Sequence, residues 1–339
     1  MTNYKNFTSL SNFSNEELLD ILDLAARVKS DDYRSQEAAG KVLGLMFFNP
    51  SLRTRTSFET AAAHLGAAST LIQPGQGTWT FEGNQGVVMD GGKTEHIKEA
   101  IQVLSGYCDV LGVRAFSAME DFEYDKNDRF LKTISELATV PLINLESAWE
   151  HPCQGMADWQ TLRELFGDQL GKKKIVLSWA PHPNALPMAV PNTALEVAAR
   201  SGADVTLACP REMMLEDTVI ANAQKRAAEH GKNITISDDQ QAAFDDADVI
   251  YAKSWAPSLV YKNKEKIAEL RTKTYGDWTI TADKMGLTNN ARFMHCLPIR
   301  RNVVADDAVL DSPNAVHIQQ AGNRLHAQKA ILMKLWNLS

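Results

Sequence analysis

Cysteine is scarce in this chain, with four residues among 339 and no C-x-x-C pair. Because Cys108, Cys153, Cys209 and Cys296 are scattered, the sequence predicts neither a structural zinc site nor a disulfide framework, and it favours a reducing cytoplasm. Long apolar runs are also missing, and the first residues lack the apolar core of a secretion signal. We therefore expect a cytoplasmic protein with no membrane partner.

An excess of basic charge is absent as well. The formal net charge is -7, and no long Lys/Arg block stands out against it. This balance argues against a nucleic-acid surface, so an anionic substrate must be captured by a local basic pocket. A hydrophobic content of 44% and a charged content of 23% are typical of a soluble globular protein.

Three fingerprints of common enzyme classes are missing too. The chain has no G-x-G-x-x-G after its first strand, no G-x-x-x-x-G-K-[ST] and no G-x-S-x-G. Dinucleotide-binding, P-loop and hydrolase interpretations therefore lack their motifs. A Rossmann-type oxidoreductase stays as an alternative from another class, and a binding experiment with NAD would test it.

Predicted strands and helices alternate along both halves of the chain. In the first half the strands are 42–48, 68–73, 109–114 and 141–144, and the helices are 15–29, 54–65, 95–105 and 129–138. In the second half the strands are 174–179, 204–209, 233–237, 248–252 and one closed by 294–298, and the helices are 156–166, 193–200, 216–230 and 323–336. This alternation predicts an α/β protein of two domains, each a mainly parallel sheet with helices on both faces. The glycine-rich stretch 74–93 is predicted to be a long loop.

The segment 47–59, FFNPSLRTRTSFE, has the pattern of an anion site. A buried strand ends at Asn-Pro, and a helix begins near Thr54, so the first unpaired backbone N–H groups of that helix face the loop. Ser51 and Thr54 add hydroxyls, while Arg53 and Arg55 add guanidinium groups that match phosphate oxygens. The alternative interpretation of this segment alone is a helix cap with two solvated arginines.

Further polar or reactive side chains follow the predicted strands. Arg114, Glu146, His182, Lys253 and Cys296 each stand at or just beyond a strand end. In parallel sheets ligands bind beyond these carboxyl ends, so the residues are candidates for one active site in the cleft between the domains. Taken singly, each has a structural alternative, such as a solvated strand end for Arg114 or a core thiol for Cys296.

The motifs SLRTR (51–55), HPCQ (151–154) and HCLP (295–298) occur in this order, about one domain apart. This combination resembles the aspartate/ornithine carbamoyltransferase family over essentially the whole chain. The resemblance implies a carbamoyl phosphate-binding domain over 1–150, joined by the final helix 323–339, and an acceptor domain over 151–322. It implies carbamoyl transfer with no cofactor and no metal, because carbamoyl phosphate is already an activated anhydride. The enzyme then has to align an uncharged amine and stabilise an oxyanion.

The resemblance also assigns roles to residues. The implied catalytic residues are Arg114, His151 and Cys296. The implied carbamoyl phosphate ligands are Ser51, Leu52, Arg53, Thr54, Trp79, Arg114, His151, Gln154, Cys296, Leu297 and Arg324. A turn role for His151 and a core role for Trp79 are the structural alternatives.

Within the family, the chain resembles the branch that carbamoylates N-acylated ornithine. It lacks a D-x-x-x-S-M-G segment and carries YAKSW (251–255), VMDG (88–91) and LPIRRN (297–302). The implied acceptor contacts are Glu146, His182, Lys253, Leu297 and Arg300. In this branch Trp79 is contributed to the site of the neighbouring subunit, which implies a homotrimer.

The acyl group is predicted from two positions. The resemblance places a glutamate of the acetyl enzymes at Thr94 and a lysine at Val304. Because a glutamate would repel an anionic succinyl tail, its loss favours succinyl, although Asn184 stands where a basic residue would help to hold that tail. We therefore expect N-succinyl-L-ornithine to be converted to N-succinyl-L-citrulline in arginine biosynthesis, with N-acetyl-L-ornithine as the alternative acceptor. A non-catalytic relative that binds an anion is a more distant alternative.

Overall fold

The computed structural model describes residues 6–339, which form two compact units. Unit 1 comprises 6–118, 123–153 and 324–339, and unit 2 comprises 119–122 and 154–323. Each unit contains a five-stranded sheet in which every neighbouring pair of strands is parallel. The predicted α/β class with two mainly parallel sheets is confirmed.

The sheet of unit 1 has the strand order β1-β7-β6-β2-β3. The strands are β1 (Asn6–Phe7), β7 (Leu142–Glu146), β6 (Val110–Arg114), β2 (Val42–Phe47) and β3 (Ala68–Ile72). Strands β6 and β7 are buried along their whole length, as expected for parallel strands covered on both faces. Gly112 in β6 allows this packing, because a Cβ there would lie 2.9 Å from the Leu145 side chain.

The helices of unit 1 are α1 (Asn15–Ser30), α2 (Arg53–His64), α3 (Ile97–Tyr107), most of α4 (Phe122–Lys126) and α5 (Arg129–Leu137). Two of them, α1 and α3, begin at side chains that cap them. The start of α1 carries a complete capping box, in which the Ser14 hydroxyl accepts from the Glu17 N–H and the Glu17 carboxylate accepts from the Ser14 N–H. The helix predicted over 15–29 therefore begins at the predicted residue.

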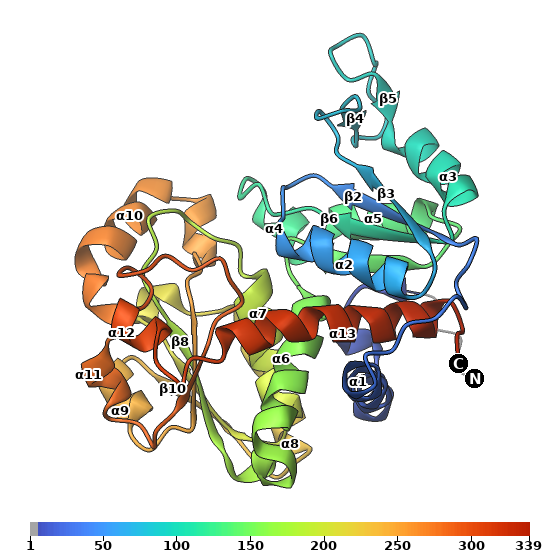
Figure 1. Ribbon diagram of the computed structural model, residues 1–339. Helices are drawn as coiled ribbons and strands as arrows, with labels where there is room; N and C mark the ends of the chain where they lie inside the picture. Colours follow the sequence, from blue (N-terminus) through green and yellow to red (C-terminus); the bar gives the residue numbers. More distant parts are fainter. Residues whose placement is uncertain (1–5) are drawn as a thin grey trace. The chain divides into compact units, whose positions relative to one another are not determined.

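The segment predicted as one long loop over 74–93 contains a short strand. β4 (Phe81–Glu82) pairs in parallel with β5 (Glu95–His96). The helix predicted from residue 95 begins instead at Ile97, because the His96 ring caps it by accepting from the Lys98 N–H at 3.1 Å. Figure 1 shows β4 and β5 projecting from the sheet of unit 1, beyond α3.

The sheet of unit 2 has the order β10-β9-β8-β11-β12. Its strands are β8 (Lys174–Trp179), β9 (Asp204–Ala208), β10 (Ile234–Ser237), β11 (Val249–Lys253) and β12 (Arg292–Met294). Its helices include α7 (Ala189–Arg200), α8 (Asp217–Ala228), α9 (Gln240–Phe244), α10 (Lys264–Glu269), α11 (Ala282–Met285) and α12 (Asp307–Leu310). A π-helical turn, Leu270–Thr274, follows α10 directly.

Two helices contribute residues to both units, and both are longer than predicted. α6 (Pro152–Phe166) begins four residues before the predicted start, since proline fits the first helical position. α13 (His317–Leu335), drawn in red in Figure 1, begins six residues early. Within residues 6–339, no helix has the length and apolar content that crossing a membrane requires.

Candidate active site

The start of α2 is open to an anion. Leu52 occupies the N-cap position, makes no side-chain capping bond and is 77% exposed. Ser51 accepts a hydrogen bond from the Thr54 N–H at 3.2 Å, which shapes the loop in front of the helix. Backbone N–H groups at such a terminus attract phosphate. Arg55, by contrast, is exposed and pairs with Glu59 at 3.0 Å, so the solvated-arginine alternative holds for this residue.

The Thr54 hydroxyl joins two buried arginines. Its oxygen accepts from Arg324 Nη2 at 2.7 Å and, more weakly, from Arg114 Nη1 at 3.4 Å. A hydroxyl has two acceptor positions and one donor, so its proton stays available for a ligand. The nearby positive charges of Arg114 and Arg53 lower the pKa of Arg324, together with burial, which is the larger cause. Unit 1 therefore gathers three guanidinium groups at the start of α2.

Glu146 is held against this cluster by a strained backbone. It ends β7 with φ of 141°, a region that favours glycine, where the pairing of β6 with β7 shifts register. The Asn144 side chain supports this conformation by accepting from the Glu146 N–H at 2.9 Å. The Glu146 carboxylate accepts from Arg114 at 2.7 Å and lies 3.4 Å from His151 Nε2. Glu146, expected to contact the acceptor, therefore lies among the residues expected to bind carbamoyl phosphate.

His151 is a neutral imidazole in this setting. Burial lowers its pKa well below the ordinary value, and the nearby charges of Arg324 and Arg114 lower it further. The ring is 3% exposed and precedes the first turn of α6. A neutral imidazole carries one N–H, so it can donate a hydrogen bond to a substrate oxygen without carrying a positive charge.

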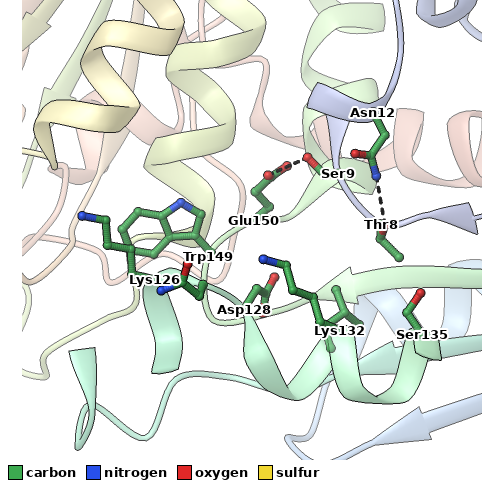
Figure 2. A pocket seen from close by; sticks show the side chains of 11 residues that line it. Thr8, Ser9, Asn12, Lys126, Asp128, Lys132, Ser135, Trp149 and Glu150 are labelled. Atoms are coloured by element: carbon green, nitrogen blue, oxygen red, sulfur yellow. Dashed lines mark hydrogen bonds between the residues drawn. The ribbon is translucent and has the colours of Figure 1, made fainter. Parts of the chain in front are cut away.

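The segment 147–150, which joins Glu146 to His151, is anchored on its other side. Glu150 accepts from the Ser9 hydroxyl at 2.7 Å, as Figure 2 shows, and Ser147 donates to Asp128 at 2.5 Å. Burial raises the pKa of Asp128 to about 6, which the Ser147 hydrogen bond opposes. Trp149, Glu150 and Asp128 line a cavity of about 290 Å³. These anchors fix the ends of the segment and with them the two side chains that flank it.

Unit 2 gathers a second basic cluster around His182. Arg300 Nε donates to His182 Nε2 at 3.1 Å, and Arg271 donates to the His182 carbonyl at 2.8 Å. Burial lowers the pKa of His182, and the charges of Lys253, Arg300 and Arg271 lower it further. Lys253 ends β11, is buried, and hydrogen-bonds the Ser254 carbonyl at 2.9 Å. Such a cluster suits the carboxylate of an amino acid substrate.

The HCLP segment follows β12 and turns sharply. Cys296 is buried, and the Leu297 N–H donates to His295 Nδ1 at 2.9 Å. Leu297 has φ of 57° and precedes a cis proline bond. Val304, further along, is 2% exposed, and its backbone bonds to Ile280, so its side chain belongs to the core of unit 2.

Trp79 and Thr94 lie together on the projecting β4–β5 element of unit 1. Trp79 is 52% exposed and donates to the Glu95 carboxylate at 2.6 Å, next to Thr94 in the chain. An exposed tryptophan excludes the alternative that Trp79 fills the core. The structure thus joins a predicted carbamoyl phosphate ligand and a predicted acyl-specificity residue on one element.

Arg271 is the functional candidate that the sequence did not reveal. It belongs to the π-helical turn, is 4% exposed, and its Nε makes no hydrogen bond within residues 6–339. No motif contains it, and its 89-residue separation from His182 hides the contact from any local pattern. Only the basic cluster around His182 identifies it.

Comparison with known proteins places the chain in a family. Residues 5–164 match the family model described as aspartate/ornithine carbamoyltransferase, carbamoyl-P binding domain, and 188–335 match the one described as aspartate/ornithine carbamoyltransferase, Asp/Orn binding domain. The chain belongs to the aspartate/ornithine carbamoyltransferase family. It is therefore an enzyme of the carbamoyltransferase class. The second match runs to 335, whereas the structure of this carbamoyltransferase assigns 324–335 to unit 1, where Arg324 contacts Thr54.

Individual relatives cover nearly the whole carbamoyltransferase chain. The N-acetylornithine carbamoyltransferase of Xanthomonas campestris pv. campestris is 45% identical over 98% of this chain and 97% of its own length. The N-succinylornithine carbamoyltransferase of Bacteroides thetaiotaomicron is 36% identical over 98% of both chains. The predicted resemblance to the N-acylornithine branch is confirmed by these relatives.

A solved structure of acetylornithine transcarbamylase with acetylcitrulline superposes on this carbamoyltransferase with a TM-score of 0.94, at 44% identity over 98% of this chain and 99% of the other. Variants of acetylornithine transcarbamylase in which a glutamate is replaced by proline or alanine superpose equally well, with a TM-score of 0.94 and 44% identity over the same shares. Those variants were complexed with carbamyl phosphate and N-succinyl-L-norvaline.

Proposed function

We propose that this carbamoyltransferase moves the carbamoyl group of carbamoyl phosphate to the δ-amine of an Nα-acylated ornithine, within arginine biosynthesis. The products are the N-acylcitrulline and phosphate. The observation that carries the donor half of this proposal is the cluster of Arg53, Arg114 and Arg324 around Thr54, at a helix start whose N-cap residue, Leu52, makes no side-chain hydrogen bond. The three guanidinium groups carry two more positive charges than the Glu146 carboxylate beside them neutralises, and this excess suits a phosphate dianion.

Unit 1 supplies most of the residues that bind carbamoyl phosphate in this proposal, and Gln154, Cys296 and Leu297 belong to unit 2. Ser51, Leu52, Arg53 and Thr54 hold the phosphate through side chains and the backbone at the start of α2. Arg114, His151 and Gln154 contact the carbamoyl group. The further predicted ligands are Trp79, Cys296, Leu297 and Arg324.

The reaction needs no covalent intermediate. The uncharged δ-nitrogen attacks the carbonyl carbon and forms a C–N bond, while the carbonyl oxygen takes up negative charge. Thr54, Arg114 and His151 donate hydrogen bonds to this oxyanion, and each such donor contributes roughly 3–4 kcal/mol in comparable sites. The C–O bond to phosphate then breaks, phosphate leaves with the electron pair, and it takes the surplus proton of the nitrogen. A neutral His151 fits this scheme because it donates an N–H and does not protonate the attacking amine.

Unit 2 binds the acceptor in this proposal. Lys253 and Arg300, with His182, supply the positive field for the acceptor carboxylate, and Leu297 supplies a backbone contact. Glu146 is the predicted acceptor contact from unit 1, where it already accepts from Arg114. An acylated α-nitrogen carries no charge, so this basic cluster needs no counter-charge for an ammonium group.

Similarity along the whole chain favours acetyl as the acyl group. The relatives named N-acetylornithine carbamoyltransferase are 42% to 45% identical, against 36% for those named N-succinylornithine carbamoyltransferase. These identities support the alternative acceptor better than the succinyl acceptor expected from the sequence. N-acetyl-L-ornithine is accordingly the first candidate.

N-succinyl-L-ornithine is the second candidate, because of the residue at position 94. Thr94 stands where the resemblance places a glutamate of the acetyl enzymes, and acetylornithine transcarbamylase variants that lack a glutamate are complexed with N-succinyl-L-norvaline. The concentration of charge at Lys253, Arg271 and Arg300 also suits an acceptor with two carboxylates. Val304 is buried in the core of unit 2, so in this proposal it influences the choice of acyl group only by packing against neighbouring residues.

We also propose a homotrimer in which the exposed Trp79 reaches the site of a neighbouring copy. Size-exclusion chromatography with light scattering tests the assembly. In a mixture of Trp79→Ala and Arg53→Ala chains, shared sites should restore activity that neither variant has alone. Buried free thiols on all four cysteines support a reducing compartment such as the cytoplasm.

A phosphate-release assay with carbamoyl phosphate tests the function. Ornithine, N-acetylornithine and N-succinylornithine are offered as acceptors at equal concentrations. We expect turnover with an acylated acceptor and little with free ornithine. A higher kcat/KM for free ornithine would overturn the acylated acceptor, and the ratio of the other two decides between acetyl and succinyl.

A further inference from the structure

Asp158 is a buried carboxylate at the centre of a hydrogen-bond network in unit 2. It lies on α6, is 2% exposed, and accepts three side-chain hydrogen bonds. Oδ1 accepts from Gln154 Nε2 at 2.7 Å and from Gln320 Nε2 at 2.6 Å, and Oδ2 accepts from the Tyr251 hydroxyl at 3.0 Å. Burial and the nearby charge of Asp158 raise the pKa of Tyr251 well above its ordinary value, so the tyrosine stays a donor.

The first arm of the network fixes which way the Gln154 amide faces. Three donors are directed at the two Asp158 oxygens, and the NH₂ of Gln154 is one of them, so the Gln154 carbonyl oxygen turns away from Asp158. The carbamoyl group that Gln154 is proposed to contact carries an NH₂ of its own, which requires an acceptor. Asp158 therefore selects the amide orientation in which the Gln154 carbonyl oxygen can accept from this NH₂. In the reverse orientation the NH₂ of Gln154 would face the NH₂ of the carbamoyl group, and both groups are donors.

The second arm reaches the HCLP segment. Gln320 donates to Asp158 through Nε2 and accepts from the His295 N–H through Oε1 at 2.9 Å. The adjoining turn is closed by the bond from the Leu297 N–H to His295 Nδ1. One carboxylate thus holds the HPCQ glutamine directly and the start of the HCLP turn through a single intermediate side chain.

We propose that Asp158 is a positioning residue for carbamoyl transfer, which orients the Gln154 amide and anchors the backbone at His295. This inference rests on the proposed function, because it assigns the Gln154 carbonyl oxygen to the carbamoyl NH₂. Asp158 itself touches neither substrate in this scheme. It acts through side chains that do.

The test compares Asp158→Ala with Gln154→Ala and with the double variant. Loss of this buried acceptor is expected to lower kcat/KM for carbamoyl phosphate about 10- to 100-fold. Because Asp158 acts largely through Gln154, the double variant should fall no more than about threefold below Gln154→Ala alone. Inhibition by inorganic phosphate, which depends on the start of α2, should stay within about twofold.

Glu164→Gln is the matched control. Glu164 lies on the same helix and also accepts from three amides, but it is solvent-exposed, and these amides, of Gln160, Gln319 and Asn323, lie outside HPCQ and HCLP. A general loss of packing between α6 and α13 would lower the melting temperature of Asp158→Ala and of Glu164→Gln. It would not make the kinetic effects of Asp158→Ala and Gln154→Ala non-additive.

Full additivity of Asp158→Ala and Gln154→Ala, or an equal kinetic loss in Glu164→Gln, would overturn the inference. A neutron crystal structure of Asp158→Ala, which locates the amide hydrogens, tests it independently of activity, and a Gln154 amide that keeps its orientation there would also overturn it. An unmodified chain that is inactive with every acceptor would refute the proposed function instead. The structure of Asp158→Ala does not depend on turnover, so it distinguishes failure of the Asp158 inference from failure of the proposed function.

Discussion

Replacing Thr54 by valine tests the candidate site directly, because valine keeps the shape of a side chain that is 1% exposed and removes only its hydroxyl. That hydroxyl accepts from Arg324 at 2.7 Å and from Arg114 at 3.4 Å, and in the proposed reaction its proton is donated to the oxyanion. The variant therefore removes one transition-state donor and leaves two guanidinium groups without this acceptor.

The expected magnitude follows from these bonds. Loss of one oxyanion donor typically costs about 3–4 kcal/mol, which corresponds to a 100- to 1,000-fold lower kcat. Without substrate, the unpaired Arg324 N–H should also lower the free energy of unfolding by about 1–3 kcal/mol. Phosphate release at saturating acceptor measures the first effect, and denaturant unfolding measures the second.

Thr56→Val is the matched control for this variant. Thr56 lies two residues further along α2, but it is exposed. We expect this control to keep kcat and stability close to those of the unmodified chain. The reasoning fails if Thr54→Val retains kcat within threefold, or if Thr56→Val loses as much activity as Thr54→Val does.

Four further predictions follow from single residues. Arg53→Ala should raise the KM for carbamoyl phosphate about 10- to 100-fold, because it removes a charge-assisted hydrogen bond. Arg55→Ala is the control and should leave this KM unchanged, because the Arg55 side chain is exposed and paired on the surface. Equal effects of the two variants in initial-rate assays would contradict the phosphate site. Thr94→Glu should shift the kcat/KM ratio toward N-acetylornithine, and an unchanged ratio would remove the argument for succinyl from this position. Arg271→Met should raise the KM for N-succinylornithine more than that for N-acetylornithine, and parallel changes would limit Arg271 to a structural role. Asp128→Asn should raise the free energy of unfolding at pH 8 by up to about 3 kcal/mol and little at pH 4. Its folded pKa of about 6 lies above the unfolded value, so the native state loses stability as pH rises from about 4 to 6; an equal gain at both pH values would contradict this cause.

The sequence by itself determined the order of the longer strands and helices, because the spacing of apolar residues is a local property. The strand 174–179 was predicted with the bounds that β8 has, and α2 begins one residue before the predicted Thr54. Motifs are equally readable from the sequence: SLRTR, HPCQ and HCLP identified the family, and YAKSW, VMDG and LPIRRN identified its N-acylornithine branch. The start of α6 was missed by four residues, although Pro152 is favourable in a first helical turn.

Only the tertiary structure decided which side chains meet. Arg324 and Thr54 are 270 residues apart, and no local pattern predicts that the hydroxyl of one accepts from the guanidinium of the other. Glu146 joins Arg114 because of a positive φ and a register shift between neighbouring strands, neither of which the residue types specify. Arg271 had no motif at all, and its contact with His182 comes from a π-helical turn packed against the loop after β8. The periodicity of apolar residues predicts helices and strands, whereas the contacts between these elements depend on packing across the whole chain. The sequence motifs therefore indicated the class of reaction, and the fold set the geometry of the side chains.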